Sequence, residues 1–528
     1  MKISKSILFF TTLFFLNLNA QDIPPEVLEG MPAEMKEKMM AGKEEKSKDY
    51  ETIQEFLDDG EYETNDGFMT LHKNVEDDEY FLQLDKNDLE KEFIYFAYVL
   101  NAPQAAGVRG GAIGQGAVLE FRRFKDEIAL FKKNTNFSNE TDNNIGKADL
   151  TNIMEAFLDS FEVVVEEGES IVISVSDLFL SETLTSVSPN LPREYRDFVD
   201  LDLGRLDDDK TFINQVRNYP KNTAVEVTFG FSNPKPNQRN AVYAVADARF
   251  TSIVARHLFV EMPDNQFNPR VADQRVGYFS QRVTDLSTYD NYPQRDLINK
   301  WRLIKKDPEA ELSEPVNPIV FWVEKSTPEE IKPMVVKGIE AWNFAFERAG
   351  FKNAVVAKIQ PDDADWDAGD IQYNVVRWSS SPRPAFSGYG PSIGNPRTGE
   401  LIAADIVQEF NAIKRGYDYR KIWGWTPESD PLEQWIVSLT MHEVGHTIGL
   451  RHNFSASYLH GPREVHDISV TGNTTISSIM DYDPINIAPE GMEPVSYTHL
   501  RANETKAKLV CRLLLEKKKG GGGGGGGG

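Results

Sequence analysis

Cysteine is almost absent from this chain, which contains one, Cys511, among 528 residues. A single cysteine cannot form an internal disulfide, so the fold has to be stabilised by buried apolar side chains. A chain of this length buries enough apolar surface for several cores. Stability therefore requires neither a disulfide nor a metal ion.

Positive charge and long apolar runs are also scarce. The 82 Asp and Glu residues outnumber the 57 Lys and Arg residues and give a formal net charge of −25. Such a surplus of carboxylates repels nucleic acid and anionic membranes, so we expect neither as a partner. The longest apolar run, from Ile7 to Leu16, is too short for an ordinary spanning helix. We expect no membrane span.

The first 20 residues have the composition of a signal peptide. Two lysines precede the apolar run, and Leu18, Asn19 and Ala20 come before Gln21. This predicts an exported protein, either periplasmic or secreted. Residues 21–48 are charged and Met-rich, which is typical of a linker or a pro-segment.

The last 34 residues look foreign to the protein. From Val495 the sequence resembles the translation of a sequencing adapter that runs into a poly-G tail. It contains Cys511, seven Lys or Arg and two Glu, so its removal lowers the net charge from −25 to −30. We therefore expect the native sequence to end near Pro494.

Aromatic and β-branched runs separated by turns dominate the first half of the chain. They predict a small N-terminal module over residues 49–105 and a β-rich accessory domain over residues 106–310. The glycine-rich residues 107–116 lack the spacing of a phosphate-binding loop and are expected to form a flexible connector. No fixed-period repeat is present.

The pattern changes over residues 311–494, which alternate strands with helices. Thr327 and Glu330 form a T-x-x-E cap for a helix that should stop at Gly350. One face of this helix is apolar and should pack on a sheet made of NAVVAK, IQYNVVRW and LIAADIVQ. The predicted fold class of the chain is α+β.

The stretch MHEVGHTIGLRHNF, residues 441–454, carries three of the eight histidines in the chain. His442 and His446 are one helical turn apart, so their imidazoles can face one ion. Gly449 can end the helix in a left-handed conformation and bring His452 back toward them. Three imidazoles leave one position of a tetrahedral zinc open for water, and Glu443 can accept the proton of that water.

These residues match the pattern H-E-x-x-H-x-x-G-x-x-H, and the chain therefore resembles the metzincin clan of zinc endopeptidases. Met480 stands where the clan has its Met-turn, and Tyr482 where some members have a zinc ligand or oxyanion donor. The layout is similar to that of large secreted bacterial zinc metalloproteases with uncharacterised N-terminal domains. A cysteine-free chain before Val495 excludes latency through a thiolate on the zinc.

The resemblance implies a catalytic domain with a mixed sheet and two long helices over residues 311–494. Its C-terminal subdomain would be truncated, and the segment from Ser387 to Phe410 would be the edge strand that pairs with an extended substrate. It also implies one catalytic zinc on His442, His446 and His452, with Glu443 as general base. The expected activity is endopeptidase cleavage of proteins or peptides.

Alternatives remain open at this point. A zinc hydrolase of cell-wall peptides would use the same residues, and a protease scaffold can serve as a non-catalytic binding protein. The tyrosine at position 482 can also be a packing residue. A loop with Asp362, Asp363, Asp365, Asp367 and Asp370 could take Ca²⁺, although its spacing favours a solvated acidic loop. The remaining histidines before Val495 lack metal-ligand spacing: His72, His257, His460 and His466.

Overall fold

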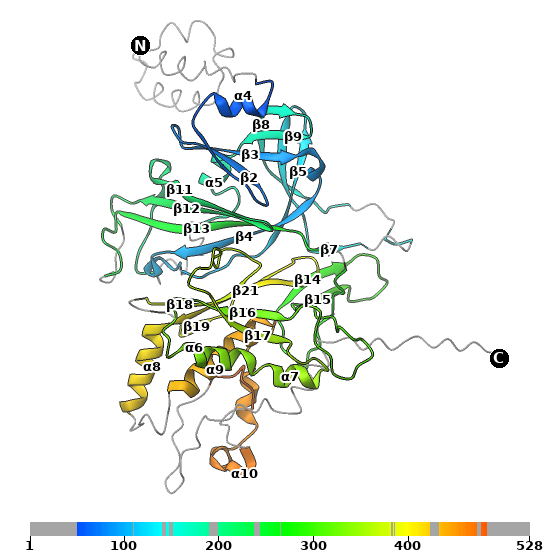
Figure 1. The fold of residues 1–528 in the computed structure, drawn as a ribbon, viewed down its shortest axis with the longest axis vertical. Helices are drawn as coiled ribbons and strands as arrows, with labels where there is room; N and C mark the ends of the chain where they lie inside the picture. The colour runs from blue at the N-terminus through cyan, green and yellow to red at the C-terminus, as the bar shows by residue number, and fades with distance from the viewer. Residues whose placement is uncertain are drawn as a thin grey trace, which may run out of the picture.

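The computed structural model describes residues 50–482, apart from 109, 140–143, 147–150, 189–198, 237–242, 265, 382–383, 385, 423–431 and 472–476. The predicted signal peptide, the 21–48 segment and the stretch from Val495 lie outside the described residues. Two halves are stacked along the long axis of the molecule. The upper half consists mostly of strands, and the lower half has a sheet with helices below it (Figure 1). Within the described residues, no helix is both long and apolar enough to cross a membrane.

The upper half is one 12-stranded antiparallel sheet. Its order is β1-β2-β3-β9-β8-β6-β5-β4-β13-β12-β10, and β11 pairs with β12. The strands are β1 (Tyr62–Asn65), β2 (Thr70–Asn74), β3 (Glu79–Asp85), β4 (Glu92–Asn101), β5 (Ala117–Phe124), β6 (Glu127–Lys132), β8 (Ala156–Glu167), β9 (Ser170–Ser174), β10 (Arg205–Leu206), β11 (Phe212–Tyr219), β12 (Asn222–Ser232) and β13 (Phe250–Glu261). Two short helices, α4 (Ile53–Asp58) and α5 (Ser176–Leu180), pack on it.

The two ends of this sheet meet, which closes it around a large apolar core. Asn65 Nδ2 donates to the Val216 carbonyl (3.1 Å), and Asn218 Nδ2 donates to the Asn65 carbonyl (2.8 Å). Phe229, Leu130 and Ile173 are fully buried inside. The predicted separation of residues 49–105 from 106–310 has no counterpart in the sheet, because β4 pairs with both β5 and β13.

The glycine-rich segment is not the flexible connector that the sequence predicts. Gly111 N–H donates to the Val99 carbonyl (2.7 Å), Val99 N–H donates to the Ala112 carbonyl (2.8 Å), and Gly114 N–H donates to the Ala97 carbonyl (2.8 Å). The segment therefore continues the ladder along β4. Glycine is required here by backbone geometry and close packing, since Gly111 has φ +84° and a Cβ on Gly116 would lie 2.6 Å from the Phe96 ring.

The lower half contains a six-stranded mixed sheet of order β17-β16-β18-β21-β19, with β20 also paired to β21. The strands are β16 (Ile319–Val323), β17 (Val355–Ile359), β18 (Asn374–Ser379), β19 (Gly388–Tyr389), β20 (Ser392–Gly394) and β21 (Leu401–Glu409). The first four in the order are parallel, whereas β19 and β20 run antiparallel to β21 at the edge. The three strand sequences proposed for this sheet all lie in it.

The helices of the lower half are α6 (Lys332–Glu340), α7 (Asn343–Arg348), α8 (Phe410–Ile422), α9 (Leu432–Thr447) and α10 (Ile468–Thr471). The predicted T-x-x-E cap is wrong. The cap position is Ile331, which makes no side-chain cap bond, because residues from Pro328 form a separate turn first. The predicted stop at Gly350 is confirmed, since this glycine has φ +91°, but the predicted single helix is divided into α6 and α7 by a turn at Ala341 and Trp342.

The boundary between the halves falls earlier than residue 310. Tyr278, Ile298 and Trp301 pack in the apolar core of the lower half, together with Val335, Ile339 and Phe346 of α6 and α7. Tyr278 precedes and Trp301 follows two strands of a small sheet, which consists of β7 (Phe137–Ser138), β14 (Ser280–Asp285) and β15 (Gln294–Ile298). Just after β15, Lys300 N–H donates to the Gly399 carbonyl (3.0 Å) of the lower half. Residues near 270–303 thus pack with the half that carries the histidine motif.

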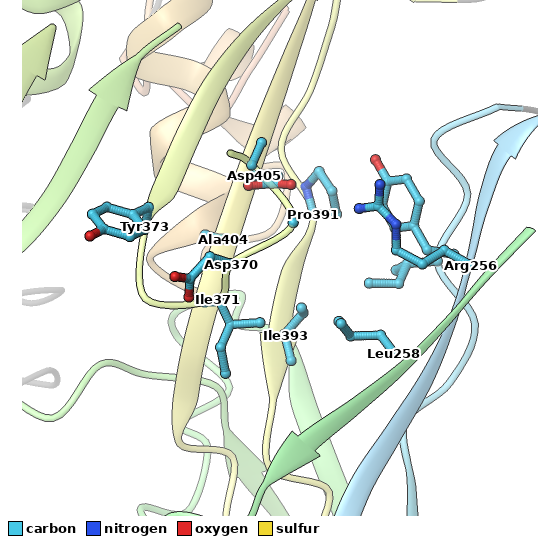
Figure 2. A pocket seen from close by; sticks show the side chains of 14 residues that line it. Arg256, Leu258, Asp370, Ile371, Tyr373, Pro391, Ile393, Ala404 and Asp405 are labelled. Carbon is cyan, nitrogen blue, oxygen red and sulfur yellow. The ribbon is translucent and has the colours of Figure 1, made fainter. Parts of the chain in front are cut away.

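The acidic loop of residues 362–370 forms hydrogen bonds between the two halves. Asp367 accepts hydrogen bonds from Arg217 Nη1 and the Tyr219 hydroxyl, both at 2.9 Å, and Asn222 Nδ2 donates to the Gly369 carbonyl (2.9 Å). A cavity of about 40 Å³ lies along the same seam, with Arg256 and Leu258 of β13 facing Ile393 and Asp405 (Figure 2). One of the aspartates considered for Ca²⁺ is therefore engaged by the upper sheet.

Candidate metal centre

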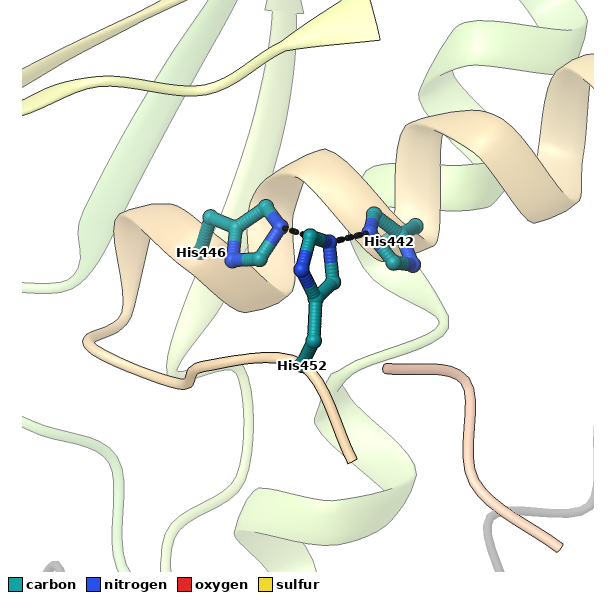
Figure 3. A group of neighbouring side chains, drawn as sticks. All are labelled: His442, His446 and His452. Atoms are coloured by element: carbon teal, nitrogen blue, oxygen red, sulfur yellow. Dashed lines mark hydrogen bonds between the residues drawn. The ribbon is translucent and has the colours of Figure 1, made fainter. Parts of the chain in front are cut away.

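Helix α9 presents the motif because its inner face is apolar up to the histidines. Ile436 and Val444 are fully buried, and His442 and His446 lie one turn apart near the end of the helix. Gly449, with φ +102°, ends the helix: its N–H donates to the His446 carbonyl (2.9 Å), and Leu450 N–H donates to the Gly445 carbonyl (3.0 Å). The chain then turns back and carries His452 beneath the helix (Figure 3).

The three imidazoles point at one another. His452 Nε2 lies 3.1 Å from His442 Nε2 and 3.2 Å from His446 Nε2 (Figure 3). Two nitrogens bound at about 2.05 Å to one tetrahedral zinc would be about 3.3 Å apart. Within the described part of the chain, these histidines are the one group of three or more potential ligands that could hold a metal ion. The spacing of the nitrogens fits zinc.

Backbone carbonyls fix which nitrogens are free. His442 Nδ1–H donates to the Ile479 carbonyl and His446 Nδ1–H donates to the Leu450 carbonyl, both at 2.7 Å. With the proton on Nδ1, each Nε2 carries a lone pair toward the common point. Burial lowers the pKa of His442 to about 4 and lowers that of His446 and His452 as well. Neutral imidazoles are the form that binds a metal.

Glu443 lies beside the cluster and is buried, with 5% of its surface exposed. Its carboxylate faces the edge strand, where a Cβ on Gly388 would be 2.6 Å from Oε1 and one on Gly390 would be 2.6 Å from the Glu443 carbonyl. Burial raises the pKa of Glu443 to about 8, and a hydrogen bond from Gly390 N–H opposes part of that rise. A dication nearby would lower this pKa again.

Met480 and Tyr482 reach the site from the last described segment. Met480 is buried under α9, where a Cβ on Gly445 would be 2.2 Å from its Sδ, and its carbonyl accepts from Asn453 N–H (2.8 Å). The Tyr482 ring centroid is 4.6 Å from that of His452 and 5.5 Å from that of His442. Burial raises the pKa of its hydroxyl, so the proton is retained at neutral pH.

All five site residues named from the sequence thus lie together. His72 and His257 lie in the upper half, where His72 contacts Thr64 and Gln83 and His257 contacts Tyr95. Sequence reasoning missed Gly388 and Gly390, whose missing side chains make room for Glu443. The glycines of the SGYG stretch could have indicated a close approach of another segment. The sequence does not show that this segment is α9 with Glu443.

Comparison with known families agrees with this geometry. Residues 428–504 match a family model described as Met-zincin, and residues 110–306 match one described as a domain of unknown function (DUF5117). The Met-zincin match extends ten residues past Pro494, into the stretch from Val495 that resembles a sequencing adapter. A search of the curated proteins found no match. The Met-zincin match and the three-histidine cluster together indicate a metzincin-like zinc metallopeptidase.

Proposed function

We propose that the intact protein is an exported zinc-dependent endopeptidase that hydrolyses peptide bonds in extracellular or periplasmic proteins. One observation carries the proposal: three neutral imidazoles converge on a point beside the buried carboxyl group of Glu443. Export rests on the signal-like composition of residues 1–20.

His442, His446 and His452 would hold the zinc through Nε2. When bound, zinc supplies a Lewis acid that polarises a carbonyl and lowers the pKa of water toward about 7. The carbonyls of Ile479 and Leu450 keep two of the rings in the ligating tautomer and orientation.

Glu443 would act as the general base. Its carboxylate accepts a proton from the attacking water and later delivers it to the amine of the leaving peptide. Because Gly388 and Gly390 pack directly on this residue, the carboxylate has little freedom to rotate away. The Tyr482 hydroxyl, which stays protonated, would donate to the oxyanion that forms on the substrate.

Strands β19 and β20 would bind the substrate. Both run antiparallel to β21 at the edge of the sheet. Gly388 of β19 and Gly390, which follows β19, pack on Glu443. An extended peptide that pairs with such an edge is placed by main-chain hydrogen bonds and needs no particular sequence for them.

The test compares the full chain with its Glu443→Ala variant in zinc content and in chelator-sensitive cleavage of casein and of peptidoglycan peptides. We expect about one zinc in each protein and at least a 100-fold loss of casein cleavage in the variant. Glu433→Ala is the matched control, because Glu433 lies on the same helix and forms an exposed ion pair with Lys337.

The outcomes separate the alternatives. Cleavage of peptidoglycan peptides without cleavage of casein would replace the substrate class by cell-wall peptides. Zinc binding without any hydrolysis would point to a binding protein built on a protease scaffold. Cleavage that persists in Glu443→Ala would remove this residue from the mechanism.

A further inference from the structure

A segment from the region matched as a domain of unknown function lies against the loop that carries His452. Phe279 N–H donates to the Gly449 carbonyl (2.8 Å), and Arg451 N–H donates to the Gly277 carbonyl (3.0 Å). On its other side, Asn299 N–H donates to the Phe279 carbonyl (2.7 Å). The backbone of residues 277–279 is therefore held between two neighbours.

This pairing determines where the Phe279 ring lies. Neighbouring side chains of an extended segment point to opposite sides. Tyr278 is 6% exposed and belongs to the core of the lower half, whereas Phe279 is 41% exposed. The centroid of the Phe279 ring is 5.8 Å from that of His446. A large apolar side chain is thus fixed at the rim of the candidate metal centre.

Two other exposed rings border the cluster at His452. The Phe454 centroid is 5.1 Å from that of His452, and the Tyr482 centroid is 4.6 Å from it. Both side chains are more than half exposed. The cluster is therefore bordered by aromatic surface next to His446 and next to His452.

We propose that Phe279 is a specificity-determining residue that selects substrates with a bulky apolar side chain beside the scissile bond, on the side of His446. The inference rests on the proposed endopeptidase function. A substrate side chain that covers the ring removes apolar area from water on both partners. An aspartate in the same position would lose hydration without gaining a partner from the ring.

The inference also gives the upstream region a role in recognition. The backbone bonds at Gly277 and Phe279 do not involve the ring, so the side chain can be changed while the loop around Gly449 stays paired. A change in preference without a change in zinc binding is therefore the signature of this role. A merely structural role would alter both.

The test uses the zinc-loaded full chain in the Glu443→Ala background, so that binding is measured without turnover. The probes are peptide hydroxamates that differ only in the side chain next to the hydroxamate, which is Phe, Leu, Ala or Asp. We expect Phe and Leu probes to bind about tenfold more tightly than Asp, and Phe279→Ala to reduce this ratio to about twofold. Zinc content should stay at about one per chain.

Phe250→Ala is the control, because Phe250 is a comparably exposed phenylalanine on β13 of the upper sheet. It should leave the ratio unchanged, and Phe279→Leu should retain most of it. A full preference in Phe279→Ala, or loss of zinc together with the preference, would overturn this inference alone. A zinc-loaded protein that binds none of the probes would overturn the proposed function and this inference with it.

Discussion

Two buried histidine environments in this molecule differ in what they can do. Burial lowers the pKa of His257 in the upper sheet to about 4 and does the same for His442 in the candidate metal centre. The Tyr95 hydroxyl lies 2.8 Å from His257 Nδ1, and the rings of Phe179 and Phe229 pack around it. His442 instead faces the Nε2 of a second imidazole, 3.1 Å away.

A histidine metal site has to meet two conditions. Burial makes an imidazole neutral, and both environments meet this condition. Convergence of lone pairs requires further ligands at the right distance, and only the site on α9 has them among the described residues. A lowered histidine pKa is therefore no sign of a metal site unless the geometry supports it.

Removal of one histidine ligand should have the largest effect on zinc binding. In His446→Ala two imidazoles remain, and we expect the affinity for zinc to fall more than 100-fold, beyond the cost of losing an outer hydrogen bond. His257→Phe should leave the affinity unchanged, because His257 belongs to no group of potential metal ligands among the described residues. Competition with a chromophoric zinc chelator measures both. Equal losses in the two variants would show that unfolding, and not ligation, controls zinc binding.

A change at the turn that brings His452 back should have the next largest effect. Gly449 has φ +102°, and a Cβ there would lie 2.1 Å from the Asn299 carbonyl oxygen. We expect Gly449→Ala to cost about 3 kcal/mol in the free energy of unfolding and to weaken zinc binding. Urea unfolding of the metal-free protein and chelator competition measure the two effects.

The matched control for this variant is Gly168→Ala in the turn between β8 and β9. Gly168 also has a positive φ, +57°, but a Cβ there would meet nothing within 4 Å. Its cost should be about 1 kcal/mol, with no effect on zinc. Similar costs at the two positions would mean that the backbone conformation, and not the contact with Asn299, makes Gly449 necessary.

The metal centre could be predicted from the sequence because its ligands are close together in the chain. His442, His446 and His452 fall within eleven residues, and helical spacing with one glycine stop is enough to bring them together. The outer contacts were not readable, since the carbonyl of Ile479 and the ring of Phe279 come from distant segments. No periodicity encodes such long-range pairing.

The fold shows the same difference between local and long-range information. Alternation predicts strands, and the β-rich first half follows from it. Which strand pairs with which is a tertiary property, so a module ending at residue 105 seemed separate although β4 lies in the middle of the sheet. The glycines of residues 107–116 signalled flexibility, but they allow close packing against Phe96.

Acid should weaken the upper sheet through His257. The unfolded histidine has a pKa near 6.5 and the folded one about 4, so between these values only the unfolded chain binds the proton. The contribution of His257 to the free energy of unfolding is fully present above pH 6.5 and is lost as the pH falls, by about 2 kcal/mol at pH 5. Hydrogen exchange of the β12 and β13 amides at pH 7 and pH 5, corrected for the intrinsic exchange rate, measures the loss. In His257→Phe the loss should be smaller by that amount, and an equal loss would assign the effect to other groups.

The smallest expected effect distinguishes two roles for Tyr482. Tyr482→Phe keeps the ring that contacts His442 and His452 and removes only the hydroxyl. If the hydroxyl donates to the oxyanion, kcat should fall at least about tenfold while zinc affinity stays the same, because one hydrogen bond to a charged acceptor contributes about 1.5 kcal/mol or more. If it ligates zinc, the affinity should fall too, and if it only packs, neither should change. Tyr458→Phe is the control, since Tyr458 ends the short 3-10 helix Phe454–Tyr458 that follows the motif and is 90% exposed. Unchanged zinc affinity with slower turnover would show that the Tyr482 hydroxyl acts on the substrate. The environment of His257 in the upper sheet would then differ from the metal centre in catalysis as well as in ligand geometry.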